Sequence, residues 1–562
     1  WHLAFPQVFD QGGFDCILGN PPWELMELSE KEFFAQSAPH IAQAASARQR
    51  QILIQTLALD NNLLFVEYVR EKRENSGFRH FVQNSALFPT SASGRVNLYP
   101  LFVERSCSLI SPQSRAGLIV PSAVSMDAYN APLFMALVNE RRLVSLYDFE
   151  NSGELFSEVH RSYRICILTL CGTQVKVKAL QFCYFAHSTD VLGDRDRIVT
   201  LSPDDIELFS PNTLAPPMLL SSKEGELSRM VYGKFGVLVN RRSKRLSGQW
   251  SASIQRMLSL SDPGDIFRMA RELGDDAHSV AWTRLYCGKA IHQYDHRFSS
   301  WKDRWESCES TKHTDPNWAI ETEYYARTIE VQNRLADKPT KSWLLSYRDV
   351  CRATDERTVI GAVVPAAGCD TTCRNIYLSA PPDGYALFLA NINSFTFDYF
   401  ARQKVIGIHL GAGVFEQLPV LPPATYAQPC PWANDPKAES PHSPSLRDWL
   451  LPRVLELTYT AWDLEAFAAD CGWSGPPFRW DEERRFLLRC ELDAAFFHLY
   501  GVSRDDAEYI LGTFDVLERA DVRQHGEFRT KRVVLERYDA LAAAANCGQP
   551  YVSPLGSPRR AT

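Results

Sequence analysis

The stretch Phe14–Trp23, FDCILGNPPW, decides how the first part of the chain is expected to fold. Its first six residues are mostly apolar and predict a buried β-strand over Phe14–Gly19. The strand runs directly into Asn20-Pro21-Pro22-Trp23, where two prolines fix the backbone and remove two N–H donors. Ligands of an open α/β sheet bind beyond the carboxyl ends of its strands, so this rigid polar corner is predicted to hold a substrate.

The residue types in this corner suit an exocyclic amino group such as that of adenine. The Asn20 side-chain oxygen can accept one N–H and the Pro21 carbonyl the other, which frees the nitrogen lone pair to attack an electrophilic methyl group. Trp23 offers a flat face for stacking, worth about 1–3 kcal/mol per base. A base in a duplex must be flipped out to reach such a pocket, and Phe156 is the candidate second wall. The alternative is a Pro-Pro turn that only ends a strand.

The first 185 or so residues alternate apolar strands with helical stretches, as expected for an α/β domain. Pro-rich stretches at 210–218 and 419–452 mark boundaries, and the chain is mostly helical from Leu455 onward. These features predict three regions, namely 1–186, 187–425 and 426–562. The expected elements of the first region are a helical insertion over 30–73, helices over 98–110 and 133–139, and strands over 117–120, 143–149 and 164–170.

The composition excludes several classes of protein. With 45% hydrophobic and 12% aromatic residues among 562, the chain is not disordered throughout, and no apolar run approaches the ~20 residues of a membrane span. The net charge of −7 argues against a uniformly basic nucleic-acid coat, although a local basic groove stays open. The fourteen cysteines form no C-x-x-C pair, which predicts free thiols, no metal site and a cytoplasmic location.

The sequence resembles the γ-class DNA adenine-N6 methyltransferases, and in particular the methylase chains of type IIG restriction-modification and DISARM-type phage-defence systems. Asn20-Pro21-Pro22-Trp23 matches the catalytic (D/N)PP(Y/F/W) motif of that family. Three later stretches resemble its next blocks: Asn97–Phe102, Gly117–Ser122 and Tyr147–Cys166. The resemblance implies that Asn20, Pro21, Pro22 and Trp23 are catalytic and that Phe156 packs on the flipped adenine.

The resemblance also implies a target recognition domain in the middle region, carried by Leu285–Phe298, Arg348–Thr358 and Asn391–Pro419. Basic residues cluster there, as a surface that contacts DNA phosphates and bases requires. Each one alone is more often a solvated surface charge, but together they predict a DNA-facing surface. The candidates are Arg241, Arg242, Lys244, Arg245, Arg284, Lys289, His292, His296, Arg297, Arg352 and Arg357.

The chain departs from the family pattern at its beginning. The family implies S-adenosyl-L-methionine as cofactor, bound by a Gly-rich loop and acidic residues that precede the catalytic motif, whereas only 19 residues precede Asn20. Gly411-Ala412-Gly413 lies far downstream, and a lone G-x-G is a weak signal. The expectation is therefore the C-terminal half of a Rossmann-like methyltransferase sheet, a mixed α/β recognition domain and a helical tail. A Gly-rich loop upstream of Trp1 is expected, and this piece alone should bind the cofactor poorly.

These observations favour a site-specific adenine-N6 methyltransferase of double-stranded DNA, with no membrane association. Other subunits of a restriction or phage-defence system are possible partners. A first alternative is a non-catalytic DNA-binding or assembly subunit of a defence complex, built on a decayed methylase fold. A second is methylation of an amino group on RNA or protein. No acid and lysine cluster of a nuclease is evident in the sequence.

Overall fold

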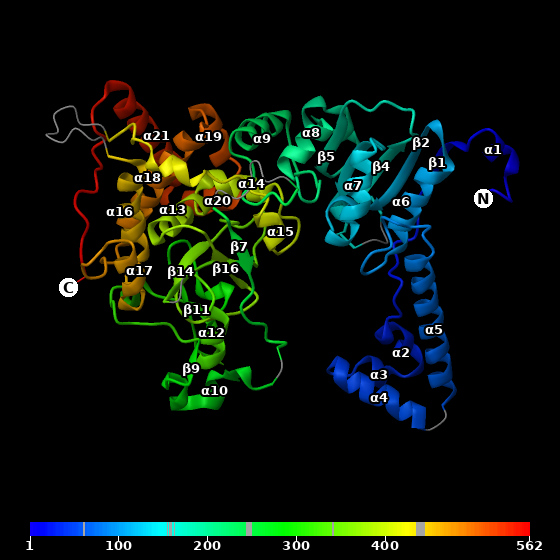
Figure 1. Ribbon diagram of the computed structural model, residues 1–562, viewed down its shortest axis with the longest axis horizontal. Coiled ribbons are helices and arrows are strands. Elements are labelled where there is room, and N and C mark those ends of the chain that lie inside the picture. Colours follow the sequence, from blue (N-terminus) through cyan, green and yellow to red (C-terminus); the bar gives the residue numbers. More distant parts are fainter. Residues whose placement is uncertain are drawn as a thin grey trace. The chain divides into compact units, whose positions relative to one another are not determined.

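The computed structural model describes residues 1–59, 62–153, 155–156, 160–161, 163–242, 250–262, 264–339, 342–433 and 444–561. The chain divides into two compact units, Trp1–Glu226 and Leu227–Thr562, and the division falls inside helix α9 (Ser222–Phe235). Each unit combines sheets with helices, which confirms the expected mixed α/β class (Figure 1). The three regions 1–186, 187–425 and 426–562 stay predictions.

The first unit contains one six-stranded sheet with the order β1-β2-β4-β3-β5-β6. β1 is parallel to β2, β4 is antiparallel to both β2 and β3, and β3 is parallel to β5. The carboxyl ends of β1, β2, β3 and β5 therefore lie at the same edge of the sheet. The strands are β1 (Phe14–Gly19), β2 (Ile110–Pro121), β3 (Leu143–Glu150), β4 (Arg164–Cys171), β5 (Leu180–Ala186) and β6 (Val199–Leu201).

Strand β1 forms where it was predicted, but the expectation that it is buried is wrong. Four of its six residues are exposed, and the Leu18 side chain is 80% exposed. β1 is at the end of the sheet and pairs only with β2 among the described residues, so one side of the strand faces solvent. The inner strands are buried as expected from their apolar residues, with Ala116, Leu118 and Val120 alternating inward on β2.

The helical insertion is confirmed, but it consists of several helices and extends beyond residue 73. Pro39 begins a new helix where the preceding one ends, because proline suits the first turn and not the interior of a helix. The helix expected over 98–110 and the one over 133–139 are also present. The helices of this unit are α1 (Pro6–Asp10), α2 (Glu30–Ser37), α3 (Pro39–Ala42), α4 (Ala47–Leu59), α5 (Leu63–Asn84), α6 (Leu98–Leu109), α7 (Ala131–Asn139) and α8 (Pro203–Phe209).

A buried carboxylate ties the carboxyl edge of this sheet together. Asp148 of β3 accepts hydrogen bonds from Ser122, which follows β2, and from Arg164, which begins β4 with Nε at 3.2 Å. It also accepts the backbone N–H of Phe185 in β5 at 3.0 Å. Phe185 has a φ of +55°, so this bond holds a residue in the left-handed region that side chains disfavour.

The second unit has two four-stranded sheets, ordered β15-β9-β12-β8 and β14-β13-β16-β7, and a β10-β11 hairpin. A core that includes Leu285, Leu344 and Val364 joins residues of both sheets. The strands are β7 (Ser253–Gln255), β8 (Phe267–Met269), β9 (Trp282–Tyr286), β10 (Ser299–Trp301), β11 (Trp305–Ser307), β12 (Tyr324–Arg327), β13 (Trp343–Arg348), β14 (Gly361–Pro365), β15 (Gly368–Cys369) and β16 (Cys373–Tyr377).

The last part of the chain is helical, as predicted, and Ser503 caps its helix by accepting the Asp506 N–H at 3.2 Å. Among the described residues, no helix has the length and apolar character that crossing a bilayer requires. The helices that follow α9 are α10 (Ala270–Leu273), α11 (Ser310–His313), α12 (Thr328–Leu335), α13 (Pro382–Ile392), α14 (Phe395–Arg402), α15 (Ala412–Phe415), α16 (Leu446–Thr458), α17 (Glu465–Asp470), α18 (Glu482–Tyr500), α19 (Arg504–Leu511), α20 (Asp515–His525) and α21 (Arg529–Cys547).

Replacing Asp148 tests how much the carboxyl edge depends on this carboxylate. Asp148→Ala leaves the Arg164 guanidinium and the Phe185 N–H without their acceptor, so we expect a loss of about 3–5 kcal/mol in unfolding free energy. Urea unfolding of the intact protein, followed through its separate transitions, measures this loss. The matched control is Asp15→Ala on exposed β1, for which we expect less than about 0.5 kcal/mol. Equal stability of the two variants would remove the structural role of Asp148.

Candidate functional site

The corner Asn20–Trp23 lies at the carboxyl end of β1 and opens into a cavity of about 460 Å³. Asn20 and Pro22 are exposed, Pro21 is buried and Trp23 is half-buried. β1 and Asn20–Pro22 form one side of the cavity, and α6 forms another with Phe102, Arg105 and Ser106, whereas Trp23 and Phe156 are not part of the lining. The volume is within the range of small-molecule sites, which span about 300–1,000 Å³.

Asn97 anchors this corner to the beginning of α6. Its Oδ1 caps the helix by accepting the Tyr99 N–H at 3.4 Å, and its Nδ2 donates to the Trp23 carbonyl oxygen at 3.2 Å. Two backbone hydrogen bonds, between Met26 and Val96 and between Leu98 and Glu24, hold the two segments side by side. The end of the corner is therefore fixed, while Asn20 at its beginning stays accessible.

The two aromatic residues expected to stack on a base follow different strands of the same sheet edge. Trp23 has a buried Nε1 that finds no acceptor among the described residues. Phe156 is half-buried in the loop after β3, where its N–H and its carbonyl oxygen each bond to the Asn151 side chain at 2.9 Å. β1 and β3 are three strand positions apart in the sheet, or about 14 Å at the usual strand spacing.

The lining of this cavity fits part of the cofactor that the family resemblance implies. The aromatic faces of Phe14 and Phe102 and the oxygen of Asn20 can contact a base or a small cation. None of the described residues that line the cavity is an aspartate or a glutamate, the residue type that ordinarily holds ribose hydroxyls in α/β folds. The described lining therefore offers aromatic faces and an amide oxygen, without a complete ribose-binding set.

The basic residues expected to contact DNA have different surroundings in the second unit. Arg242, Lys289 and Arg352 are exposed. Arg241 is also exposed, and its guanidinium forms an ion pair with Glu416 at 2.7 Å. Arg284 is half-buried, with Nε donating to the Ile320 carbonyl oxygen at 2.6 Å. The candidates Lys244 and Arg245 lie outside the described residues.

Three of the expected DNA contacts are structural instead, and the prediction is wrong for them. Arg297 is completely buried and donates to backbone carbonyl oxygens, including those of Asp315 and Trp318. His296 is 1% exposed and bonds to Asp463 at 2.9 Å. Arg357 is buried and pairs with Asp398 at 3.1 Å. These side chains hold segments of the second unit together, because each forms hydrogen bonds to carbonyl or carboxylate oxygens of residues elsewhere in the chain.

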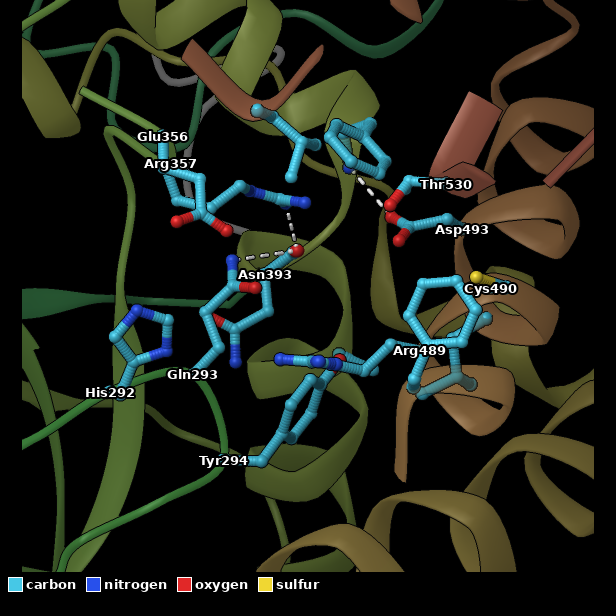
Figure 2. Close-up of a pocket in the computed structure, with 15 residues that line it drawn as sticks. His292, Gln293, Tyr294, Glu356, Arg357, Asn393, Arg489, Cys490, Asp493 and Thr530 are labelled. Atoms are coloured by element: carbon cyan, nitrogen blue, oxygen red, sulfur yellow. Dashed lines mark hydrogen bonds between the residues drawn. The ribbon is translucent and has the colours of Figure 1, made fainter. Parts of the chain in front are cut away.

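Figure 2 shows the surroundings of Arg357, a cavity of about 60 Å³ in which Arg357 and Gln293 both reach the Asn393 carbonyl oxygen. Burial and the nearby Arg348 cation lower the pKa of His292 to about 3, so this candidate is neutral at pH 7. Burial raises the pKa of Asp493 to about 6, although the Arg357 charge opposes that shift. The groups around this cavity are tuned by burial, which is typical of a polar interior.

The structure has a surface turn around Arg352 that the sequence analysis does not predict. The segments 349–352 and 406–410 pair there, through hydrogen bonds from the Cys351 N–H to the Ile408 carbonyl at 3.0 Å and from the Leu410 N–H to the Asp349 carbonyl at 2.7 Å. His409 is exposed and its Nδ1 lies 2.9 Å from the Asp349 carboxylate. We call this exposed set, Val350, Arg352, Ile406, Ile408 and His409, the Arg352 turn. The glycines at 407 and 411 were the available signal for a turn.

Part of the first unit is similar in sequence to a family of restriction-modification methylases. Residues 68–156 match the profile of the family described as "Eco57I restriction-modification methylase". This match includes Asn97, Asp148 and Phe156 and begins after the corner at Asn20–Trp23. No curated protein sequence matches the chain.

Several solved structures show a loose likeness to the chain. One is the type IIL restriction-modification enzyme MmeI in complex with DNA, at 10% identity and a TM-score of 0.33, over 75% of this chain and 54% of that one. Another is the type IIG restriction endonuclease BpuSI, at 11% identity and a TM-score of 0.25, over 84% of this chain and 52% of that one. A third is the DrdV–DNA complex, at 9% identity and a TM-score of 0.34, over 78% of this chain and 48% of that one. The chain spans about half the length of these three proteins.

The anchoring role of Asn97 can be separated from its capping role by two substitutions. Asn97→Ala removes both bonds, so we expect a loss of about 1 kcal/mol in stability and faster amide hydrogen exchange in residues 23–26. Asn97→Asp keeps the oxygen that caps α6 but cannot donate to the Trp23 carbonyl. It should keep the stability and still show the faster exchange. Unchanged exchange in both variants would contradict the proposed anchor.

Proposed function

We propose that this chain carries the acceptor-binding part of a site-specific DNA adenine-N6 methyltransferase of a restriction-modification or phage-defence system. The observation that carries the proposal is the exposed Asn20 at the carboxyl edge of the sheet, next to a cavity of about 460 Å³ and followed by two prolines. The match of residues 68–156 to a restriction-modification methylase family supports the same class of reaction.

In this proposal the residues of the corner bind and orient the amino group of a flipped adenine. The Asn20 Oδ1 and the Pro21 carbonyl oxygen accept its two N–H groups, and the adjoining prolines keep these acceptors in place before the base arrives. Asn97 keeps the end of the corner from moving, and Trp23 and Phe156 supply flat faces for the base. S-adenosyl-L-methionine, when bound, supplies an electrophilic methyl group.

The second unit is proposed to contact the DNA duplex. The Arg352 turn presents a cation, a histidine and apolar side chains on two paired segments, and a two-stranded ribbon fits the major groove. Arg242 and Lys289 add exposed positive charges to the same unit.

A second candidate function is a non-catalytic DNA-binding or assembly subunit. The observation that favours it is the absence of a carboxylate from the described lining of the cavity beside Asn20, because a working site needs groups for the cofactor ribose. If the intact protein binds DNA but transfers no methyl group to any amino group of the DNA bases, this candidate is supported over the first.

The catalytic proposal is tested by Asn20→Ala in the intact protein, with transfer of a labelled methyl group to adenine in duplex DNA as the measurement. We expect a decrease of at least about 100-fold, as for the removal of other preorganised polar contacts. Because Asn20 is exposed, the thermal unfolding midpoint should stay unchanged, and this serves as the folding control. Asn20→Asp keeps an acceptor oxygen and should retain more activity than Asn20→Ala. Activity of Asn20→Ala equal to that of the wild type would exclude the proposed role.

The DNA-contact proposal is tested by Arg352→Ala. Loss of one phosphate contact should weaken DNA binding and lower the slope of log K against log salt concentration by about 1 in magnitude. Fluorescence anisotropy with a labelled duplex at several salt concentrations measures both quantities. The matched control is Arg523→Ala on α20, another exposed arginine of the same unit, for which we expect no change. If wild type and Arg352→Ala give the same slope, the Arg352 turn does not contact DNA phosphates.

A further inference from the structure

The second unit contains a cavity of about 400 Å³ that the proposed methyl transfer does not use. It lies between the end of β9, the β10-β11 hairpin, β12 and the segment that follows β15, and Val350 of the Arg352 turn is also part of its lining. Its volume is in the range of sites for small organic molecules. It belongs to a different unit from Asn20, so it is a separate site.

Two aromatic side chains from different strands line the cavity. Trp305 is on β11 and Tyr324 is on β12, and both are half-buried. Each packs against the core of the second unit on one side, which fixes the ring without covering it fully. Leu260 and Leu285 complete the apolar part of the lining. A planar ring is the ligand shape that such walls bind most favourably.

The polar end of the cavity carries an acceptor that is held in place. Asp370 Oδ1 accepts the Thr372 N–H at 2.8 Å, the Thr372 hydroxyl at 2.7 Å and the Cys373 N–H at 3.1 Å. Its Oδ2 receives no hydrogen bond from any described residue. Gly288 lies against this segment so closely that a Cβ there would be 2.7 Å from the Thr372 carbonyl oxygen. The position therefore requires glycine, and the carboxylate is rigidly supported.

A cation stands at the opening of the cavity. Lys289 follows Gly288 and is exposed, and it forms no ion pair with a described carboxylate, including Asp370 and Glu323 of the same lining. Arg348 also lines the cavity, but its guanidinium donates to the Gly288 carbonyl at 2.7 Å and to that of Ile291. Lys289 is thus the cation left for an anionic group of a ligand, and a lysine ammonium binds phosphate well.

We propose that this cavity binds a nucleotide, with its base between Trp305 and Tyr324, a donor on the base edge facing Asp370, and its phosphate at Lys289. A carboxylate only accepts hydrogen bonds, so the site favours bases with an amino group, adenine, guanine or cytosine. Thymine presents two carbonyl oxygens on either side of its single N–H and is disfavoured. The nucleotide has two possible sources, a free mononucleotide or an extrahelical nucleotide of bound DNA.

Isothermal titration of the intact protein with the four deoxynucleoside monophosphates tests the proposal. We expect dGMP, dAMP or dCMP to bind at least about tenfold more tightly than dTMP. Trp305→Ala and Lys289→Ala should each weaken binding by about tenfold, since stacking on an aromatic ring and a phosphate contact are each lost. Trp305→Phe, which keeps an aromatic ring and the packing, should retain most of the affinity and shows that the loss in Trp305→Ala is not a folding defect.

Matched controls come from the same unit. Trp462→Ala and Arg523→Ala remove an exposed tryptophan and an exposed arginine that do not line the cavity, and both should bind as the wild type does. A single strand with an internal 2-aminopurine separates the two sources: quenching of its fluorescence that depends on Trp305 indicates a nucleotide within DNA, and binding of monophosphates alone indicates a free one. Both results support the site.

The proposal is overturned if neither the monophosphates nor the strand binds, or if binding is the same in Trp305→Ala and Lys289→Ala as in the wild type. Its failure is distinguishable from failure of the proposed methyl transfer, because Asn20→Ala should leave nucleotide binding in the second unit unchanged. Asp370→Asn gives a further check. It keeps the oxygen that supports Thr372 and introduces a donor, so it should reduce the preference against dTMP to less than about threefold.

Discussion

The carboxylate of Asp148 is the interaction on which the first unit depends most. It is fully buried and receives hydrogen bonds from three other segments, at the end of β2, the beginning of β4 and the end of β5. An isolated buried charge is very unfavourable, and only a complete set of donors makes it stable. The same requirement therefore fixes the relative positions of the strand ends from which the loops of the candidate site emerge.

The candidate site combines a fixed end with an open one. Asn97 holds the Trp23 carbonyl and the first turn of α6, whereas Asn20 has no such restraint and is exposed at the cavity. This division suits a group that must meet a substrate in a set geometry, because the loop loses little conformational entropy when the substrate binds. Phe156 is held in a similar way by Asn151, through both of its backbone polar groups.

In the second unit, basic residues occur in two different environments. Arg297 and Arg357 are buried and donate hydrogen bonds to carbonyl oxygens and a carboxylate, while Arg352 and Lys289 are exposed at the surface. All four are basic residues, and nothing in the local sequence pattern distinguishes the buried ones from the exposed ones. The separation comes from acceptors far along the chain, such as Thr460 for Arg297 and Asp398 for Arg357.

The sequence by itself determined the local features of this protein. The apolar run before Asn20 predicted a strand, the two prolines predicted a stiff corner, and the residues from Leu455 onward predicted helices; the structure has the strand and the helices where they were expected. These features depend on residues close together in the chain, so their physical causes are present in the sequence.

Only the tertiary structure decided which side chains meet. The exposure of β1 follows from its place at the end of the sheet, and the pairing of 349–352 with 406–410 that forms the Arg352 turn joins distant segments. Likewise, the cavity with Trp305, Asp370 and Lys289 draws on four separate elements. Burial, ion pairing and the closing of a cavity depend on contacts between residues far apart in the chain, and a local pattern carries no information about those contacts.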